Sequence, residues 1–235
     1  MSGSTDLGAV PRTAAERRDT ARRARANFSA EVADHIRELI FDGTLVGGDR
    51  VPQDAIAEEL GVSRLPVREA LISLHLDGLV ENEPRRGAFV VPISRDDIED
   101  HYSMYGYMLG LAARRASARM DDATVRRLED LIAAMGEAPH APSTHEAHWT
   151  FHAIINHLGG SQRLKAVLRQ MAHNLPRSVY DIPHAGSPEA EQGHRAIVAA
   201  LRAGDGDRVA AECEAHLRAE GALVVAELAR RGLLV

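Results

Sequence analysis

Histidines are concentrated in the second half of this 235-residue chain, at spacings that suit metal binding. His148 and His152 are four residues apart, so on a helix both imidazoles project from one face, the usual way a helix presents two metal ligands. His194 and His216 lie in later helical segments beside apolar residues, and a helical bundle can direct such side chains into one interior cavity. Four nitrogen ligands suit Zn²⁺, Ni²⁺, Cu²⁺ or Fe²⁺ better than Mg²⁺ or Ca²⁺.

The spacing alone leaves two alternatives open. Ordinary surface or hydrogen-bonded histidines produce the same HxxxH pattern. A bundle with several histidines could also be a metalloenzyme that activates water. Against the enzyme, the segment His148–His152 lacks the Glu beside the first His that an HExxH hydrolase uses as its base, and Glu146 precedes the pair. Phosphate-binding glycine loops and dinucleotide fingerprints are also missing from the sequence.

The histidines belong to a segment that is rich in Ala and Leu and shows helical periodicity with short turns from Arg95 onward. This pattern predicts an antiparallel all-helical bundle of about six helices, with Asp122 and Ser161 among the N-caps. The expected helices are Arg95–Arg119, Ala123–Met135, Ser143–Leu158, Ser161–Tyr180, Pro188–Ala203 and Asp205–Arg231.

The stretch from Gly61 to Pro92 has a different pattern, in which a turn, a helix, a short strand, a basic turn and a strand follow one another. This order predicts a helix-turn-helix followed by a wing, a fold that reads DNA grooves. Arginine at such positions pairs with guanine or holds a phosphate, although each arginine alone also fits a solvated charge. The candidate DNA contacts are Ser63, Arg64, Leu65 and Arg68 at the start of the second helix, and Arg85, Arg86 and Gly87 in the wing.

The segment Ala30–Ser94 resembles the winged helix-turn-helix domain of the GntR family of bacterial transcription regulators, through the motifs VSRLPVREAL, LDGLV and RRGAFV. The resemblance implies that Arg64, Arg68 and Gly87 contact operator DNA. Gln53 and Asp54 replace the Glu-Arg pair that is common before the second helix. An acidic Asp54 cannot make the phosphate contact open to an arginine, so a different operator preference is expected.

From about Asp96 the chain resembles the FCD effector-binding domain of the FadR-like branch of this family, through the motifs FHAIINHLGGSQRL and HRAIVAALRAGD. The resemblance implies a metal held by His152, His194 and His216, with His148 at the position of the family's Asp or Asn. It points to Zn or Ni as cofactor. An all-imidazole set leaves the ion's charge uncompensated, which favours an anionic effector. Alternatively, His148 does not bind the ion and a three-His site remains, or His145, three residues earlier on the same face, takes its place or is an ordinary solvated histidine.

Effector contacts are expected on the first and fourth bundle helices. Where the family often carries an Arg and, four residues on, a Glu facing the cavity, this chain has Tyr105 and Leu109. Without this arginine, the cavity lacks a side chain that could bind a carboxylate group of the effector. The surrounding tyrosines and methionines suit an apolar cavity, core packing or a dimer interface. His173, Asn174 and Arg177 are the other candidate contacts.

The predicted organisation is mainly α: a disordered or frayed basic arm at 1–26, a winged helix-turn-helix at 27–94 and a helical FCD-like domain at 95–235. With a net charge of −6, DNA binding must depend on local arginines. The single Cys213 excludes an internal disulfide. Without a signal peptide or an apolar run of transmembrane length, the expected location is the cytoplasm, with no membrane partner.

These features together predict a ligand-responsive transcription regulator rather than an enzyme. A homodimer would match the two-fold symmetry of double-stranded operator DNA. We expect a repressor that a small metabolite, such as an organic acid held by the metal, releases from the operator. The alternatives are a regulator whose effector is the metal ion itself, and a helical-bundle metalloenzyme.

Overall fold

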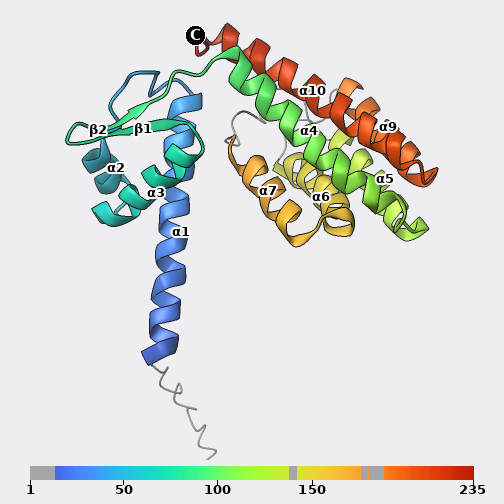
Figure 1. Ribbon diagram of the computed structural model, residues 1–235, viewed down its shortest axis with the longest axis horizontal. Coiled ribbons are helices and arrows are strands. Elements are labelled where there is room, and N and C mark those ends of the chain that lie inside the picture. Colours follow the sequence, from blue (N-terminus) through green and yellow to red (C-terminus); the bar gives the residue numbers. More distant parts are fainter. Residues whose placement is uncertain (1–13, 138–141, 176–178, 180–187) are drawn as a thin grey trace, which may run out of the picture.

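The computed structural model describes residues 14–137, 142–175, 179 and 188–235. Two groups of elements are visible in Figure 1: a small N-terminal unit with a two-stranded sheet and a larger helical unit. The mainly α architecture expected from the sequence is confirmed. No helix in the described ranges combines the length and apolar character needed to cross a membrane.

The N-terminal unit contains α1 (Ala14–Phe41), α2 (Gln53–Glu59), α3 (Arg64–Leu76), β1 (Val80–Glu83) and β2 (Gly87–Val90). The strands pair antiparallel as a hairpin, the geometry of a wing. Apolar side chains recur at helical spacing on α1 and α3 and form the core with both strands. The fully or almost fully buried members are Val32, Ile36, Phe41, Val67, Leu74, Val80 and Ala88.

Helix α1 begins at Ala14, within the stretch expected to be a disordered or frayed basic arm. It continues without a break into the segment Val32–Phe41 that packs in the domain core. The first thirteen residues of the expected arm lie outside the described residues. Helix α1 therefore crosses the boundary that was expected near residue 26 between the basic arm and the winged helix-turn-helix domain.

The helical unit contains α4 (Arg95–Ser117), α5 (Asp122–Glu137), α6 (Pro142–Gly159), α7 (Gln162–His173), α9 (Pro188–Arg202) and α10 (Gly206–Arg230). Most bounds lie within two residues of those expected. The exception is α7, which ends at His173 instead of Tyr180. Pro176 follows closely, and proline disfavours helical backbone in the residue before it.

Short polar side chains begin several of these helices. Ser94 and Asp97 form a reciprocal capping box at the start of α4, which satisfies two backbone N–H groups. Ser161 accepts from the Leu164 backbone N–H as expected. The expectation for Asp122 was wrong by one residue, because the Thr124 N–H donates to the side chain of Asp121.

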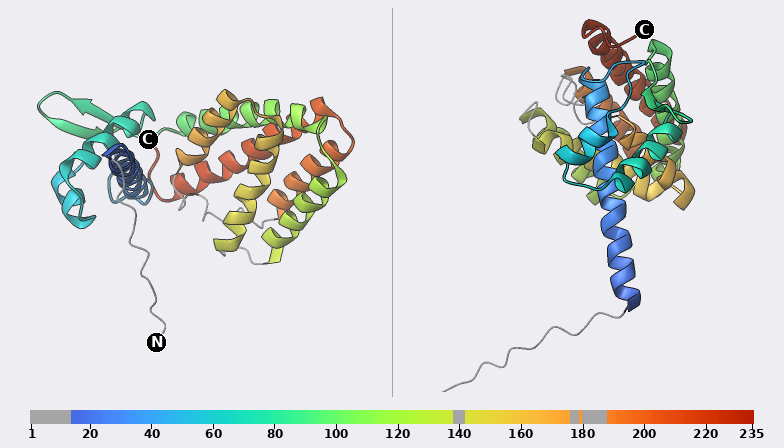
Figure 2. Two further views of the ribbon diagram at one scale, coloured as in Figure 1. Left: turned by 90° about the horizontal axis from the view of Figure 1, so that it is seen from below. Right: turned by 90° about the vertical axis from the view of Figure 1, so that its left-hand side faces the viewer.

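Helices α4 and α10 run side by side through the bundle (Figure 2) and approach closely at glycines. A Cβ at Gly106 would lie 3.1 Å from the Glu214 Cα, and a Cβ at Gly110 would lie 3.1 Å from the Ala210 carbonyl oxygen. Such distances are tighter than ordinary side-chain contacts, so the lack of a side chain allows the two backbones to approach. Helix α6 likewise brings Gly159 against the backbone of α4.

The contacts between the units include two hydrogen-bonded sites. After α10, the chain returns to the N-terminal unit, where Val235 donates its N–H to the Ile93 carbonyl at 3.0 Å. Separately, Asp77 at the C-cap of α3 accepts from Gln170 Nε2 of α7 at 2.8 Å. The other Asp77 oxygen accepts from Arg37 Nη2 of α1 at 2.6 Å, and both side chains of this pair are only 5% exposed.

Candidate metal centre and nucleic-acid interface

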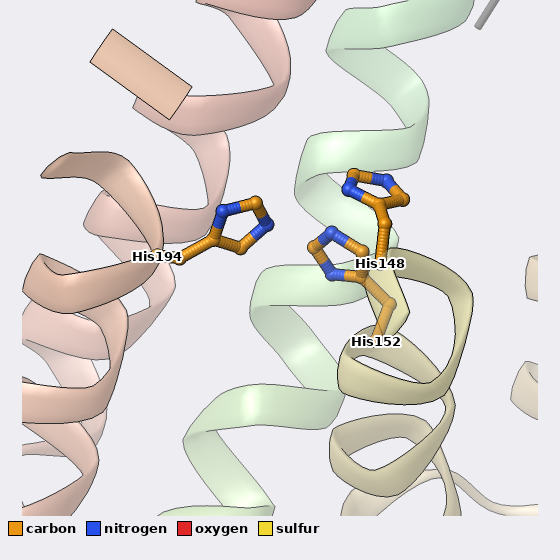
Figure 3. A group of neighbouring side chains, drawn as sticks. All are labelled: His148, His152 and His194. Atoms are coloured by element: carbon orange, nitrogen blue, oxygen red, sulfur yellow. The ribbon is translucent and has the colours of Figure 1, made fainter. Parts of the chain in front are cut away.

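The four histidines expected to bind a metal meet between three helices. His148 and His152 lie on α6, His194 on α9 and His216 on α10, and all four are buried. Figure 3 shows His148, His152 and His194 directed toward one another. Their ring nitrogens lie within 4.8 Å of one another, and the His216 ring centroid lies 4.2 Å from that of His194. The structure therefore brings the predicted set together in one cluster.

The HxxxH spacing and the bundle packing together explain this convergence. Residues four apart on α6 share one face, and their rings meet those of His194 on α9 and His216 on α10. Gly193, beside His194, provides room for the next ring, because a Cβ there would lie 2.5 Å from His216 Nδ1. The close approach of α9 and α10 at this point sets the separation of His194 and His216.

An acidic residue that sequence reasoning missed completes the cluster. Glu220 lies four residues after His216 on α10 and is buried. Its Oε1 lies 3.2 Å from His216 Nε2 and 4.0 Å from His148 Nε2. The i, i+4 spacing of His216 and Glu220 was the available signal. The family resemblance locates the acid on α6 and therefore does not predict one on α10.

The donor atoms fit a divalent transition metal. Both ring nitrogens of His152 and the Nε2 of His194 are buried without a hydrogen-bond partner among the described residues. Burying unpartnered polar atoms is costly, and coordination to a metal would satisfy them. The His194 ring is also hydrogen-bonded to the Ala190 backbone, an arrangement typical of metal-binding histidines.

Burial controls the charge of these groups. Desolvation, with smaller contributions from neighbouring histidines, holds the pKa values of His152 and His194 well below the usual histidine value. Both rings are therefore neutral near pH 7, as metal ligation requires. For Glu220, burial by itself raises the pKa, but His216 and His148 lower it more, so the carboxyl stays ionised.

A cavity of about 920 Å³ adjoins the cluster and reaches His152. Its walls come from α1, α4, α6 and α7. Of the residues expected to contact an effector, Tyr105 and His173 line it. Leu109 is instead fully buried in the core, Asn174 bonds Gln170 at 3.1 Å, and Arg177 lies outside the described residues.

Sequence reasoning missed several other residues that line this cavity. Lys165 and Arg169 bring positive charge, Trp149 brings an aromatic surface, and Asp34 and Glu38 come from α1 of the N-terminal unit. A molecule in the cavity would thus contact both units. The half-buried His145 lines the cavity as well.

The start of α3 presents the expected DNA contacts to solvent. Ser63, Arg64, Leu65 and Arg68 are all exposed. Ser63 occupies the N-cap position, but its side chain makes none of the expected hydrogen bonds to the helix. Arg64 Nε lies 2.8 Å from Asp54 Oδ1 across the turn between α2 and α3. The acid noted as a departure from the family pattern therefore pairs with a predicted base-reading arginine.

The wing turn carries the other predicted DNA contacts. Arg85 and Gly87 have positive φ angles of 66° and 112°, and a Cβ at Gly87 would lie 2.9 Å from Arg50 Nε. Both observations explain why glycine is needed at the end of this turn. Arg86 pairs with Glu83 and stacks over the Phe89 ring with 5.2 Å between the guanidinium carbon and the ring centroid. Arg85 and Arg86 are exposed.

A winged helix-turn-helix joined to a helical bundle, with a cavity lined by both units, defines a two-domain DNA-binding regulator. Comparison with protein families agrees: residues 28–90 match the bacterial regulatory proteins of the gntR family, and residues 100–219 match the FCD domain. The chain belongs to the gntR family of transcription regulators and carries an FCD domain. It is a regulator rather than an enzyme.

Individual relatives support this assignment. The chain is 28% identical over 205 residues to the uncharacterised HTH-type transcriptional regulator Rv0043c of Mycobacterium tuberculosis, covering 87% of this chain and 84% of the relative. It is 25% identical over 188 residues to the HTH-type transcriptional repressor RspR of Escherichia coli, covering 78% and 82%. The fold is similar to that of E. coli McbR/YncC, with a TM-score of 0.63, 19% identity and coverage of 86% and 98%.

The buried histidines predict a pH dependence of stability in the metal-free protein. His101, whose pKa burial lowers to about 4, behaves like His152 and His194. All three stay neutral when folded, while the unfolded chain takes up protons below its histidine pKa of about 6.5. The free energy of unfolding should therefore fall from pH 7 to pH 5, by up to about 1.4 kcal/mol per pH unit for each such histidine.

Urea unfolding in EDTA at pH 7, 6 and 5 would measure this effect. The variant His101→Gln should show a shallower pH dependence, because one buried titratable ring is removed. A stability that is constant over this range would contradict the assignment of neutral, buried histidines.

Proposed function

We propose that this regulator is a repressor released from its operator by a small molecule bound beside a metal ion in the helical domain. The observation that carries the proposal is that His152 belongs both to the histidine cluster and to the wall of the cavity. A molecule in the cavity can therefore reach an ion in the cluster. The repressor RspR among the relatives supports the direction of regulation.

The ion we propose is Zn²⁺ or Ni²⁺, because imidazole nitrogens suit both. His148, His152, His194 and His216 would supply the ligands. A bound ion would attract an oxygen of the effector and hold it at the inner end of the cavity. The cavity size also suits a small metabolite.

We propose an organic acid as the effector, on the evidence of the cavity wall. Lys165 and Arg169 line it and favour a carboxylate, whereas Tyr105 and Trp149 offer aromatic surfaces. Glu220 places a carboxylate in the cluster, so the charge of a bound ion would be partly compensated before an anionic effector arrives. The two cationic side chains on α7, Lys165 and Arg169, now carry the proposal, in a cavity that Asp34, Glu38 and Glu146 also line.

A route to the DNA-binding unit runs through α7. Arg169 and His173 of this helix line the cavity, and Gln170 between them donates to Asp77 at the end of the recognition helix α3. Asp77 is also the buried partner of Arg37 on α1. A ligand that moves α7 would change this interdomain contact, and a ligand regulates only through such a difference between two arrangements.

We also propose a cytoplasmic homodimer that binds operator DNA with one winged helix per half-site. The exposed apolar side chains on α4 suit a subunit contact, because such side chains are otherwise costly in water. They are Met104, Tyr107, Met108 and Leu111, which recur at spacings of one helical turn. Tyr102 and Tyr105 of the same helix are instead buried.

The role of the arginines can be tested on a duplex that the protein selects from a random-sequence pool. Arg64→Ala and Arg68→Ala should each weaken binding about 10- to 100-fold at fixed salt, since a bidentate base contact contributes about 1–3 kcal/mol. Fluorescence anisotropy would measure the affinity. Arg95→Ala, an exposed arginine paired with Glu99 at the start of α4, is the matched charge control. Unchanged affinity in both variants would refute the assigned role.

The metal centre can be tested with the double variant His152→Ala/His194→Ala. It should lose bound metal and respond less to effector, because two ring nitrogens of the cluster are removed. Native mass spectrometry and elemental analysis would report metal content, with His157→Ala, at the exposed end of α6, as control for metal content alone because His157 also lines the cavity. Equal metal content in wild type and double variant would refute the site. If metal alone changes operator affinity in the wild type, the ion is the effector.

The interdomain route is tested by Gln170→Ala. This change removes the side-chain contact to Asp77 but leaves the buried Arg37 pair intact. The folded domains should keep their stability, whereas the operator affinity of the ligand-free protein should change and its response to ligand should shrink. Gln192→Ala, on α9 away from α1 and α3, is the control. An unaltered affinity and response would exclude this contact as the route.

A further inference from the structure

Glu220 is a buried carboxylate surrounded by imidazoles. It is 7% exposed, and its ion-pair partners among the described residues are His148 and His216, with neither a lysine nor an arginine. Taking a carboxylate out of water costs several kcal/mol unless an opposite charge lies close by. The groups closest to this carboxylate are therefore imidazole rings, at 3.2 Å for His216 and 4.0 Å for His148.

The placement of Glu220 is that of a ligand. Its carboxylate oxygen and the ring nitrogens of His194 and His216 all lie within 4.8 Å of one another. An ion bound at about 2.0–2.2 Å from each donor would bring these atoms to separations of roughly 3–4 Å. Small side-chain rotations would produce that geometry. His216 and Glu220 are also held on one face of α10 by their i, i+4 spacing.

We propose that Glu220 is the carboxylate ligand of the metal centre. The anionic ligand then comes from α10, because the position on α6 where the resemblance implies an acid is occupied by His148. The inference rests on the proposed metal centre and adds the identity of its charged donor. With one carboxylate bound, the net charge of the centre falls from +2 to +1. The ion would then be retained without an effector, and the effector need not supply the missing charge.

A positioning role is the competing explanation. In it, Glu220 accepts a hydrogen bond from His216 and orients that ring without touching the ion. Both roles predict weaker metal binding after substitution. The two roles differ in the spectrum. If Glu220 binds the ion, its substitution lets another group enter the coordination sphere and changes the visible absorption of bound Co²⁺, whereas loss of a positioning residue leaves the ligand set unchanged.

The experiment uses Co²⁺ as the probe in the full chain. Glu220→Ala removes the carboxylate, and Glu220→Gln removes its charge at nearly constant size. Glu212→Gln is the control, because Glu212 lies two turns earlier on α10 and pairs with Arg208 at the surface. Chelator competition would give the affinity, absorption spectra would report the ligand set, and circular dichroism would verify the fold.

We expect wild type and Glu212→Gln to bind one Co²⁺ per protomer with the same spectrum. Both Glu220 variants should bind about tenfold or more weakly, with shifted absorption bands. Sodium acetate should restore affinity and spectrum in Glu220→Ala more than in wild type, because acetate can occupy the vacated space. Unshifted bands in the folded variants, at any affinity, would overturn the proposal.

The outcome for the wild type separates this inference from the proposed function. If wild type binds no Co²⁺, Zn²⁺ or Ni²⁺, the metal centre itself is refuted and Glu220 has no ion to bind. If wild type binds an ion and Glu220→Gln does so with equal affinity and spectrum, only the role of Glu220 is refuted.

Discussion

The close contact between α4 and α10 determines the geometry of the effector domain. Gly106 and Gly110 let α10 approach the backbone of α4, and Gly159 does the same for α6. Helices that share a neighbour at such short distance are held at fixed positions, because packed interiors resist small displacements. The donors on α6 and α10 are therefore brought into one cluster by residues that bear no functional group.

The same bundle connects that cluster with the DNA-binding unit. The middle of α10 holds His216 and Glu220, and the chain that leaves the C-terminal end of α10 donates a hydrogen bond from Val235 to Ile93 of the N-terminal unit. Helix α7, which lines the cavity, contacts the recognition helix through Asp77. Changes on either helix could thus reach the winged helix through contacts that already exist, and no new interface has to form.

Much of this arrangement was predictable because it follows from periodicity. Apolar spacing gave most helix bounds within two residues, and the HxxxH spacing placed His148 and His152 on one face. Features that depend on tertiary packing were not predictable. Leu109 turns into the core while Tyr105, one helical turn earlier, lines the cavity, and the α1 wall of that cavity comes from the other unit. Capping by Asp121 in place of Asp122 shows that local bounds also shift by a residue.

Glu220 shows why a family pattern and a physical reading give different expectations. The pattern locates the acid on α6, where this chain has His148, and an all-histidine centre follows from it. Electrostatics requires only that negative charge lies near the ion, whichever helix supplies it. Since α10 lies against α9 and its side chains reach His148 and His152 of α6, an acid one turn after His216 meets that requirement equally well. A substitution at one ligand position is therefore best judged from the charge of the whole cluster, and here that charge includes a carboxylate.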